Sequence, residues 1–386
     1  MKEKNMEEND QEKFGDGVSW SRGRTLGKGS FGSVYLASLK NPRSKYSCFP
    51  SIMAVKSAEV SNSNSLQKER EVLCSLIGCT NIINCYGEET TFGYDGLMVY
   101  NLLLEYGSGG SLAERIKKSG KKGLPEAEVK CFTKSILKGL DWIHETGYVH
   151  CDLKPDNILL VPNSRRGSVY FIAKICDFGL AKKRVKVQQR VPKKRKLENY
   201  WRGTPMYISP EAVTESQQEA PSDVWSLGCI VLEMLTGKPA WELDEESLNA
   251  ENVLLKIKKV KALPKIPRGL SVQAKSFLRC CLVRNAKKRF SAEELLNHPF
   301  VEGLEDDDDN DNDDEFEEEI EEVDRSSCGS NCGDWDIGFD EDCVSYGASE
   351  EIAKIAPHFF EDQICSMKSF EIRQPYAVAF SLAARI

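Results

Sequence analysis

The strongest signal in this chain of 386 residues is one run near its middle, His150-Cys151-Asp152-Leu153-Lys154-Pro155-Asp156-Asn157. An aspartate and an asparagine stand five residues apart in this run, in a loop that a proline stiffens. Asp152 can accept a proton from an attacking hydroxyl, Lys154 can neutralise charge on a phosphate, and the Asn157 oxygen can ligate a magnesium ion. Asp177, in Asp177-Phe178-Gly179 twenty residues after Asn157, is a second candidate ligand for the metal. Together these side chains predict metal-assisted chemistry on a phosphate.

A glycine-rich run near the N-terminus supplies a candidate phosphate-binding loop with the pattern G-x-G-x-x-G-x-V. It is Leu26-Gly27-Lys28-Gly29-Ser30-Phe31-Gly32-Ser33-Val34. Its glycines let backbone N–H groups approach phosphates, and Val34 can cover a base. A similar pattern occurs in dinucleotide-binding folds, where a helix must follow it. Here Ser33-Val34-Tyr35-Leu36-Ala37 is rich in β-branched and aromatic residues, which predicts a returning strand and favours a hairpin loop over phosphates.

Hydrophobic spacing predicts the elements around these runs. Helices are expected over residues 66–77, 127–146 and 223–235, strands over residues 81–87 and 171–176 and up to Leu104, a loop insertion over residues 41–50, and a hairpin tip over residues 164–170.

Seven separated motifs follow one another in the order found in eukaryotic protein kinases, and the chain resembles that family from about Trp20 to Phe300. They are the glycine-rich run, Ala54-Val55-Lys56, Leu104-Glu105-Tyr106-Gly107, the run around Asp152, Asp177-Phe178-Gly179, Ser209-Pro210-Glu211 and Asp223-Val224-Trp225-Ser226-Leu227-Gly228. One position departs from the family, because the arginine usual before the catalytic aspartate is Cys151. The resemblance implies an α+β, two-lobed protein kinase fold, with a small β-rich N-lobe and a large helical C-lobe.

The resemblance also implies a site for ATP. Lys56 is expected to hold the α- and β-phosphates and to be steered by a helix glutamate. Glu69, in the pattern Glu-x-x-x-Leu-x-x-Leu, is expected in that role, and Glu71 is the competing candidate on a different face of the helix. Leu104 is expected to be the gatekeeper, and the backbone groups of Glu105 and Gly107 to bind adenine. Further nucleotide contacts are expected from Leu26, Gly27, Lys28, Gly29, Ser30, Phe31, Gly32, Ser33, Val34 and Ala54.

In the same way, the resemblance assigns the catalytic and metal residues. The expected catalytic residues are Asp152, Lys154, Lys56 and Glu69, and the expected ligands of Mg²⁺ are Asn157 and Asp177. The expected supporting contacts are hydrogen bonds of Thr204 with Asp152 and with Lys154, an ion pair of Glu211 with Arg289, and backbone hydrogen bonds of the catalytic loop to Asp223.

A lysine at the position of Lys154 in the catalytic loop resembles the serine/threonine class of protein kinases. Within that class, several runs resemble MAP kinase kinase kinases of the plant MEKK-like group. These runs are the glycine-rich loop, Leu104-Glu105-Tyr106 with Gly109-Gly110-Ser111-Leu112, Gly203-Thr204-Pro205, the His150-Cys151-Asp152 variant and Ser65-Leu66-Gln67-Lys68-Glu69. The resemblance implies phosphorylation of MAP kinase kinases in a stress or hormone signalling cascade. The alternatives are a serine/threonine kinase outside that cascade and a pseudokinase-like scaffold. The scaffold is disfavoured because Lys56, Asp152, Asn157 and Asp177 are all present.

Charge divides the chain into a basic body and an acidic tail. The net charge is −8, but residues 302–386 hold 26 acidic and 5 basic residues, which leaves +13 on residues 1–301. Such acidic runs are usually disordered. The expected organisation is a disordered N-terminus over residues 1–19, a kinase domain over residues 20–301, and an acidic, mostly disordered regulatory tail over residues 302–386 that could bind a regulator.

Composition also bounds partners and location. No stretch approaches the roughly 20 apolar residues that span a membrane, and the polar start is unlike a secretory signal. The 14 cysteines are therefore expected to be reduced, in the cytoplasm. Pro192-Lys193-Lys194-Arg195-Lys196 resembles a nuclear-import signal, but it also suits a solvated loop that recruits an acidic partner, or docking of the acidic tail. Nucleic acid is not an expected partner, because only Tyr200 and Trp201 add aromatics there.

The activation loop suggests an unusual form of control. Many kinases bind a phosphate on this loop through the arginine that Cys151 replaces. Residues 178–203 contain no serine or threonine, and one tyrosine, Tyr200. Both the acceptor and the receptor of the phosphate are thus missing, and we expect activity without phosphorylation of this loop.

Overall fold

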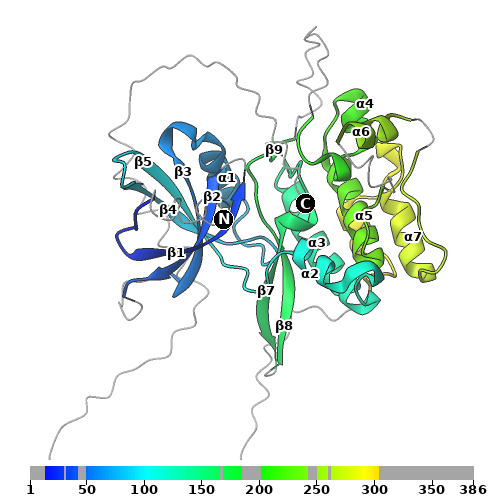
Figure 1. Cartoon of the computed structure of the whole chain (residues 1–386). Coiled ribbons are helices and arrows are strands. Elements are labelled where there is room, and N and C mark those ends of the chain that lie inside the picture. The colour runs from blue at the N-terminus through cyan, green and yellow to red at the C-terminus, as the bar shows by residue number, and fades with distance from the viewer. Residues whose placement is uncertain are drawn as a thin grey trace, which may run out of the picture. The chain divides into compact units, whose positions relative to one another are not determined.

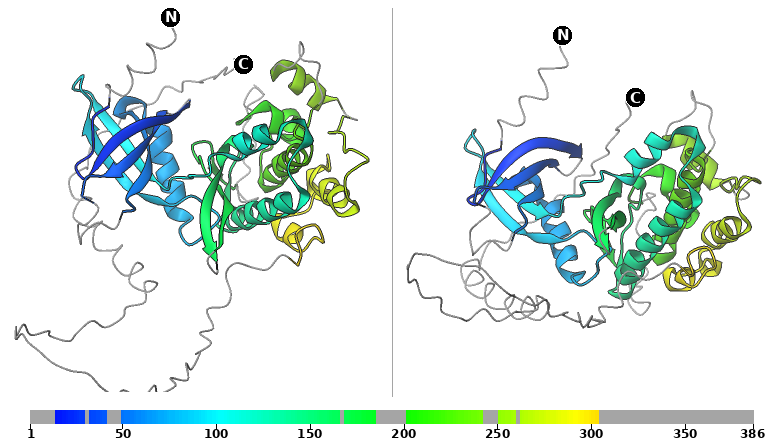
Figure 2. Two further views of the ribbon diagram at one scale, coloured as in Figure 1. Left: turned by 60° about the horizontal axis from the view of Figure 1, so that its bottom comes forward. Right: turned by 90° about the horizontal axis from the view of Figure 1, so that it is seen from below.

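The structure is a computed structural model that describes residues 14–29, 32–41, 49–165, 168–184, 201–241, 250–259 and 262–303. These residues form a β-rich lobe and a larger helical lobe (Figure 1). The views of Figure 2 separate the same two lobes. The predicted two-lobed kinase fold is therefore confirmed. Residues 1–13, most of the insertion at 41–50, the basic run at 192–196 and the tail after residue 303 lie outside the described residues.

The small lobe is built on one antiparallel sheet of five strands in the order β1-β2-β3-β5-β4. Its elements are β1 (Trp20–Gly29), β2 (Gly32–Leu39), β3 (Ile52–Glu59), α1 (Asn64–Ser75), β4 (Cys85–Phe92) and β5 (Met98–Leu104). Alternation along β5 buries both faces of the sheet, because Leu102 and Leu104 join the cluster that includes Leu66 and Leu73 of α1, whereas Leu103 joins a second cluster around Trp20. This packing positions α1 beside β3.

Two expectations for this lobe differ from the structure. The strand expected over residues 81–87 begins only at Cys85, because Asn81 and Ile83 instead exchange backbone hydrogen bonds with Ile175 of the other lobe. Residues 14–19, expected to belong to a disordered N-terminus, lie against the sheet. Arg22 holds them there, since its guanidinium donates to the carbonyl oxygens of Phe14 and Gly15 at 3.0–3.2 Å.

The large lobe is built around helices of very different exposure. Its helices are α2 (Leu112–Ser119), α3 (Glu126–Glu145), α4 (Pro210–Glu215), α5 (Ala220–Thr236), α6 (Ala250–Lys258), α7 (Val272–Cys281) and α8 (Ala292–Leu296). Helix α5 is apolar on nearly every face, and its residues from Ser222 to Leu232 are all buried. Helix α3 buries the predicted stripe that includes Phe132, Ile136 and Leu140. Helices α3 and α5 thereby support the short strands and loops that follow α3 in the sequence.

Two short sheets pack against these helices and α2. Strand β6 (Tyr148–Val149) pairs with β9 (Lys182–Lys183), and β7 (Ile158–Arg165) pairs with β8 (Ser168–Ile175). The pairing of β7 with β8 continues to the ends of both strands, so the hairpin tip is shorter than the expected 164–170. Within the described residues, no helix is long and apolar enough to cross a membrane.

Candidate active site

A cluster of three charged side chains joins the two lobes. Lys56 of β3 lies 2.7 Å through Nζ from Glu69 Oε2 of α1 and 3.0 Å from Asp177 Oδ1. The structure thus places Glu69 against the lysine, whereas Glu71 is exposed. Burial alone would lower the pKa of Lys56, but the two carboxylates raise it above its usual value. The ammonium is therefore charged at physiological pH and is held in place by both carboxylates.

The backbone around Asp177 is locked to the same cluster. Asp177 itself adopts a positive φ of 61°, a conformation that costs energy for a residue with a Cβ. The Phe178 N–H donates to Glu69 Oε1 at 3.2 Å, and the Phe178 ring packs edge-on against His150 at 5.0 Å between centroids. These contacts fix the local conformation, and hydrogen bonds of the Cys176 backbone to His150 and Asn157 hold Asp177 beside the catalytic loop.

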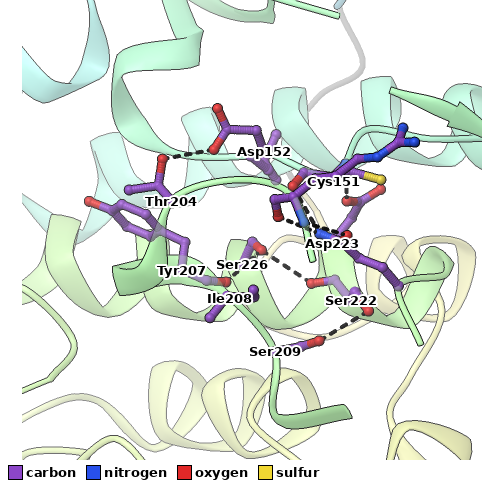
Figure 3. A pocket seen from close by; sticks show the side chains of 12 residues that line it. Cys151, Asp152, Thr204, Tyr207, Ile208, Ser209, Ser222, Asp223 and Ser226 are labelled. Carbon is purple, nitrogen blue, oxygen red and sulfur yellow. Dashed lines mark hydrogen bonds between the residues drawn. The ribbon is translucent and has the colours of Figure 1, made fainter. Parts of the chain in front are cut away.

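Asp152 lies at the centre of the second part of the site (Figure 3). The Thr204 hydroxyl donates to Asp152 Oδ1 at 2.8 Å, and Lys154 Nζ lies 3.3 Å from Asp152 Oδ2 and donates to Thr204 Oγ1 at 3.2 Å. The Asn157 amide nitrogen donates to the Asp152 carbonyl at 2.8 Å, which leaves the amide oxygen of Asn157 for another partner. The expected catalytic contacts are thus all present in the geometry.

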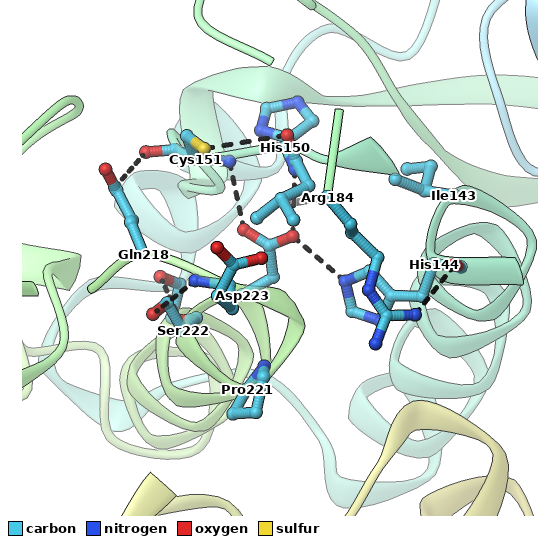
Figure 4. Close-up of polar contacts among 12 residues, drawn as sticks. Ile143, His144, His150, Cys151, Arg184, Gln218, Pro221, Ser222 and Asp223 are labelled. Carbon is cyan, nitrogen blue, oxygen red and sulfur yellow. Dashed lines mark hydrogen bonds and ion pairs between the residues drawn. The ribbon is translucent and has the colours of Figure 1, made fainter. Parts of the chain in front are cut away.

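Asp223 of α5 holds the catalytic loop from below (Figure 4). Its carboxylate accepts hydrogen bonds from the backbone N–H groups of His150 at 2.9 Å and Cys151 at 3.0 Å, and lies 3.0 Å from His144 Nε2. Burial would raise the pKa of Asp223, but the contacts with the two histidines and the backbone lower it. Asp223 is therefore an ionised anchor for the loop, as expected.

Cys151 takes the place of an arginine in this loop and is nearly buried. Burial, with the nearby Asp223 carboxylate, raises the pKa of its thiol to about 12. Cys151 is thus a neutral side chain at physiological pH. It has no charge with which to bind a phosphate.

The glycine-rich loop divides between two strands. The structure places Leu26, Gly27, Lys28 and Gly29 on β1 and Gly32, Ser33 and Val34 on β2, and Ser30 and Phe31 lie outside the described residues. Gly32 is required by packing, because its φ is +138° and a Cβ there would lie 2.4 Å from the Ser57 carbonyl. Gly27 and Gly29 differ, since a Cβ would meet nothing within 4 Å at Gly27 and only one carbonyl at 3.8 Å at Gly29. Open space at these two glycines fits a loop that covers phosphates.

The connection between the lobes offers backbone groups to an adenine. Ala54 and Leu104 are buried and face each other across β3 and β5. Among the described residues, no hydrogen bond reaches the carbonyl oxygen of Glu105 or leaves the N–H of Gly107. The side chain of Glu105 is instead occupied by Lys174, at 2.9 and 3.0 Å. One acceptor and one donor thus remain for a planar base.

Two oxygen donors fit a divalent metal between the lobes. Asn157 and Asp177 lie on adjacent segments, because the Cys176 N–H donates to the Asn157 carbonyl at 2.9 Å. Among the described residues, no group of three histidine, cysteine, aspartate or glutamate side chains gathers as a metal site. Two protein oxygens supplemented by phosphate oxygens suit Mg²⁺, which rarely uses a cage made only of protein.

Sequence reasoning missed two supporting residues. Lys174 ties the lobe connection to β8 through Glu105, which also accepts from the N–H and side chain of Asn84. His144 lies in the last turn of α3, and its Nε2 contacts the Asp223 carboxylate. Neither position carries a local signal, since both contacts join residues 69 or more positions apart. Only the three-dimensional arrangement of the lobes reveals them.

Comparison with known proteins agrees with this geometry. The protein kinase domain family matches residues 20–301. Mitogen-activated protein kinase kinase kinase 20 of Arabidopsis thaliana is 42% identical over 320 residues, which cover 83% of this chain and 89% of that protein. Mitogen-activated protein kinase kinase kinases 17 and 18 of the same plant are 38% and 37% identical over 74% of this chain, and the matches cover 70% and 78% of those proteins.

Membership of this family implies use of ATP with a divalent metal and action on protein substrates. The chain belongs to the protein kinase family and is a serine/threonine kinase of the MAP kinase kinase kinase type.

Proposed function

We propose that this kinase phosphorylates serine or threonine residues of MAP kinase kinases, with Mg²⁺ as its metal, in a stress or hormone signalling cascade. The observation that carries the chemistry is the contact of Asp152 with both Thr204 and Lys154, linked through Asn157 to the segment that carries Asp177. The names of the relatives, mitogen-activated protein kinase kinase kinases, support MAP kinase kinases as the substrate class.

In this proposal, each residue has a separate role. Asp152 orients the attacking hydroxyl and accepts its proton, while Thr204 and Lys154 hold the carboxylate in one rotamer. Lys56 binds the α- and β-phosphates and is steered by Glu69. Asn157 and Asp177 would hold the Mg²⁺, which neutralises phosphate charge when ATP is bound. Most of the rate enhancement then comes from positioning and fixed charge.

A phosphorylation assay tests the substrate class. Purified kinase is offered a panel of plant MAP kinase kinases and a generic protein substrate, with Mg²⁺ and ATP, and Asp152→Asn enzyme is the control. We expect phosphate on serine or threonine in the activation loop of at least one MAP kinase kinase, at a kcat/KM well above that for the generic substrate. Equal or lower values for every panel member would assign the enzyme to a serine/threonine kinase outside the cascade.

We also propose that phosphorylation between Phe178 and Gly203 is not needed for activity. The neutral, buried thiol of Cys151 and the absence of serine and threonine from residues 178–203 support this proposal. Enzyme made in bacteria and treated with phosphatase should keep its turnover within about twofold of the untreated enzyme, which corresponds to about 0.4 kcal/mol in activation free energy. Silencing by the phosphatase would refute it.

The tail and the basic run lead to two further proposals. The acidic tail would dock on the loop that contains the basic run at residues 192–196 and lower basal activity. Deletion of residues 302–386 should therefore raise turnover at low salt and have less effect at high salt.

The run at residues 192–196 would also direct part of the cytoplasmic protein to the nucleus. Its replacement by alanines should confine a fluorescent fusion to the cytoplasm, and an unchanged distribution would argue against that role.

A further inference from the structure

Gln218 lies buried in the short connection between α4 and α5, with 8% of its surface exposed. Its carboxamide reaches Cys151 of the catalytic loop (Figure 4). Nε2 donates to the carbonyl oxygens of Cys151 at 3.1 Å and Arg202 at 2.7 Å, and Oε1 accepts from the Arg202 N–H at 3.1 Å. Both amide hydrogens and the amide oxygen of Gln218 thus have hydrogen-bond partners.

The two segments that Gln218 joins are in direct contact. Gly203, next to Arg202, has a φ of +101°, and a Cβ there would lie 2.4 Å from the Cys151 carbonyl oxygen and 3.2 Å from Asp152 Oδ1. Only a glycine lets the backbone pass so near the catalytic aspartate. A small displacement of this segment would therefore move Thr204 relative to Asp152.

Gln218 completes the anchoring of Cys151. Asp223 accepts from the Cys151 N–H at 3.0 Å, and Gln218 donates to the Cys151 carbonyl. The residue before the catalytic aspartate is thus held at both of its backbone polar groups, by side chains near the start of α5. No charge on the Cys151 side chain is needed for this arrangement.

We propose that Gln218 is a positioning residue that ties the activation segment to the catalytic loop without a phosphate. It acts through Cys151 and Arg202, and so keeps the Thr204 hydroxyl on Asp152. The proposal rests on the kinase activity of the chain, and not on which protein is its substrate. It extends the phosphorylation-independent control proposed above by naming the contact that takes over the anchoring.

The test replaces Gln218 by methionine, which matches its length but makes no amide hydrogen bonds. The matched control is Gln217→Met, because Gln217 is the adjacent residue and is exposed. Turnover is measured on a generic protein substrate, per site that binds ATP, together with the KM for ATP. We expect kcat to fall by about 10- to 100-fold, as small misplacements of reacting groups do, with an unchanged KM for ATP. Gln217→Met should keep the wild-type kcat.

A second variant removes the donated hydrogen bonds, and the count of turnover per ATP-binding site leaves unfolded molecules out of the comparison for both variants. Gln218→Glu retains the acceptor for the Arg202 N–H but loses both donated hydrogen bonds. We expect the same loss of kcat per ATP-binding site as in Gln218→Met. A wild-type kcat per ATP-binding site in either Gln218 variant, or an equal loss in Gln217→Met, would overturn the proposal. Because the substrate is generic, these outcomes do not depend on recognition of MAP kinase kinases.

Discussion

Two buried ion pairs of this kinase look alike in composition but differ in how their cations are satisfied. Lys56 pairs with Glu69 in the small lobe, and Arg289 pairs with Glu211 in the large lobe. The Arg289 side chain is fully buried, and it donates to both Glu211 oxygens and to the carbonyls of Val283 and Pro221. The Lys56 side chain is 9% exposed and is shared with Asp177, whose side chain is 31% exposed.

This difference separates architecture from function. A guanidinium whose donors are all directed at protein groups can do nothing except hold α4 and α5 against the segment before residue 289. An ammonium that is shared with a partly exposed carboxylate is placed to meet a charged ligand. The comparison predicts that the first pair controls folding and the second controls turnover.

The largest expected effect is that of Arg289→Met on stability. The substitution would leave the buried Glu211 charge unpaired, although the hydrogen bond from the Ser222 hydroxyl remains, and would remove the guanidinium donor from two carbonyls, which costs about 3–5 kcal/mol in comparable pairs. Urea denaturation measures the free energy of unfolding. In the double variant Glu211→Leu/Arg289→Met, part of that loss should return because no charge is left unpaired. A stable single variant would show that the pair is not architectural.

Next in size is the effect of Lys56→Met on catalysis. Loss of a preorganised cation at the phosphates should lower kcat by at least about 10²–10³-fold, equivalent to about 2.7–4 kcal/mol. The domain should still fold with some loss of stability, because Glu69 keeps the hydrogen bond from the Phe178 N–H and, with a pKa that burial already raises, can take up a proton in the variant. Asp177→Asn should behave in the same way. Steady-state kinetics and thermal denaturation report both quantities, and turnover retained in both variants would contradict the site assignment.

The resemblance to protein kinases is enough to predict most of the groups in this comparison. Lys56, Glu69, Glu211 and Arg289 were all expected in the contacts that the structure has, because each belongs to a motif that the family pairs in this way. The contacts of Gln218 were not foreseeable. A carboxamide in a connection has no periodicity, and its partners include a carbonyl 67 positions away.

The start of β4 illustrates the same limit in the fold. Residues 81–83 have the composition of a strand, but long-range backbone hydrogen bonds to Ile175 decide where they lie. The ordered segment at residues 14–19 likewise depends on Arg22, whose other partners are Ser57 and Asn101. Side-chain type and local pattern therefore predict elements and motifs well, and predict poorly the contacts that join distant segments.

A smaller effect distinguishes the two candidate partners of Lys56. Glu69→Gln keeps a hydrogen-bond acceptor but removes the charge, and a hydrogen bond to a charged group is worth about 1.5–3 kcal/mol, which corresponds to roughly 10- to 100-fold. We expect kcat to fall within that range. Glu71→Gln is the matched control, because the exposed Glu71 makes no contact with Lys56 in the structure. Equal losses in the two variants would remove the special role of Glu69.

The smallest effects are pH dependences, which should appear at opposite ends of the scale for the two pairs. Burial would raise the pKa of Glu211, but the hydrogen bonds and charge of Arg289 lower it. The folded state thus binds this proton more weakly than the unfolded chain, so the contribution of Glu211 is complete above about pH 4.5 and is lost as the pH falls through the lowered value. The stability gap between wild type and Glu211→Gln should therefore shrink on acidification.

Lys56 has the opposite sign, because its pKa is raised in the folded state. Its contribution is complete below its unfolded pKa of about 10.4 and is lost only as the pH rises above it. The gap between wild type and Lys56→Met should then shrink in alkali, where the Glu211 pair is fully ionised and its gap stays constant. Urea denaturation at pH 3–5 for Glu211→Gln and at pH 10–11 for Lys56→Met measures the two gaps. A Lys56→Met gap that stayed constant in alkali would show that the raised pKa of Lys56 adds nothing to stability, and the separation of the two pairs into architecture and function would then rest on kinetics alone.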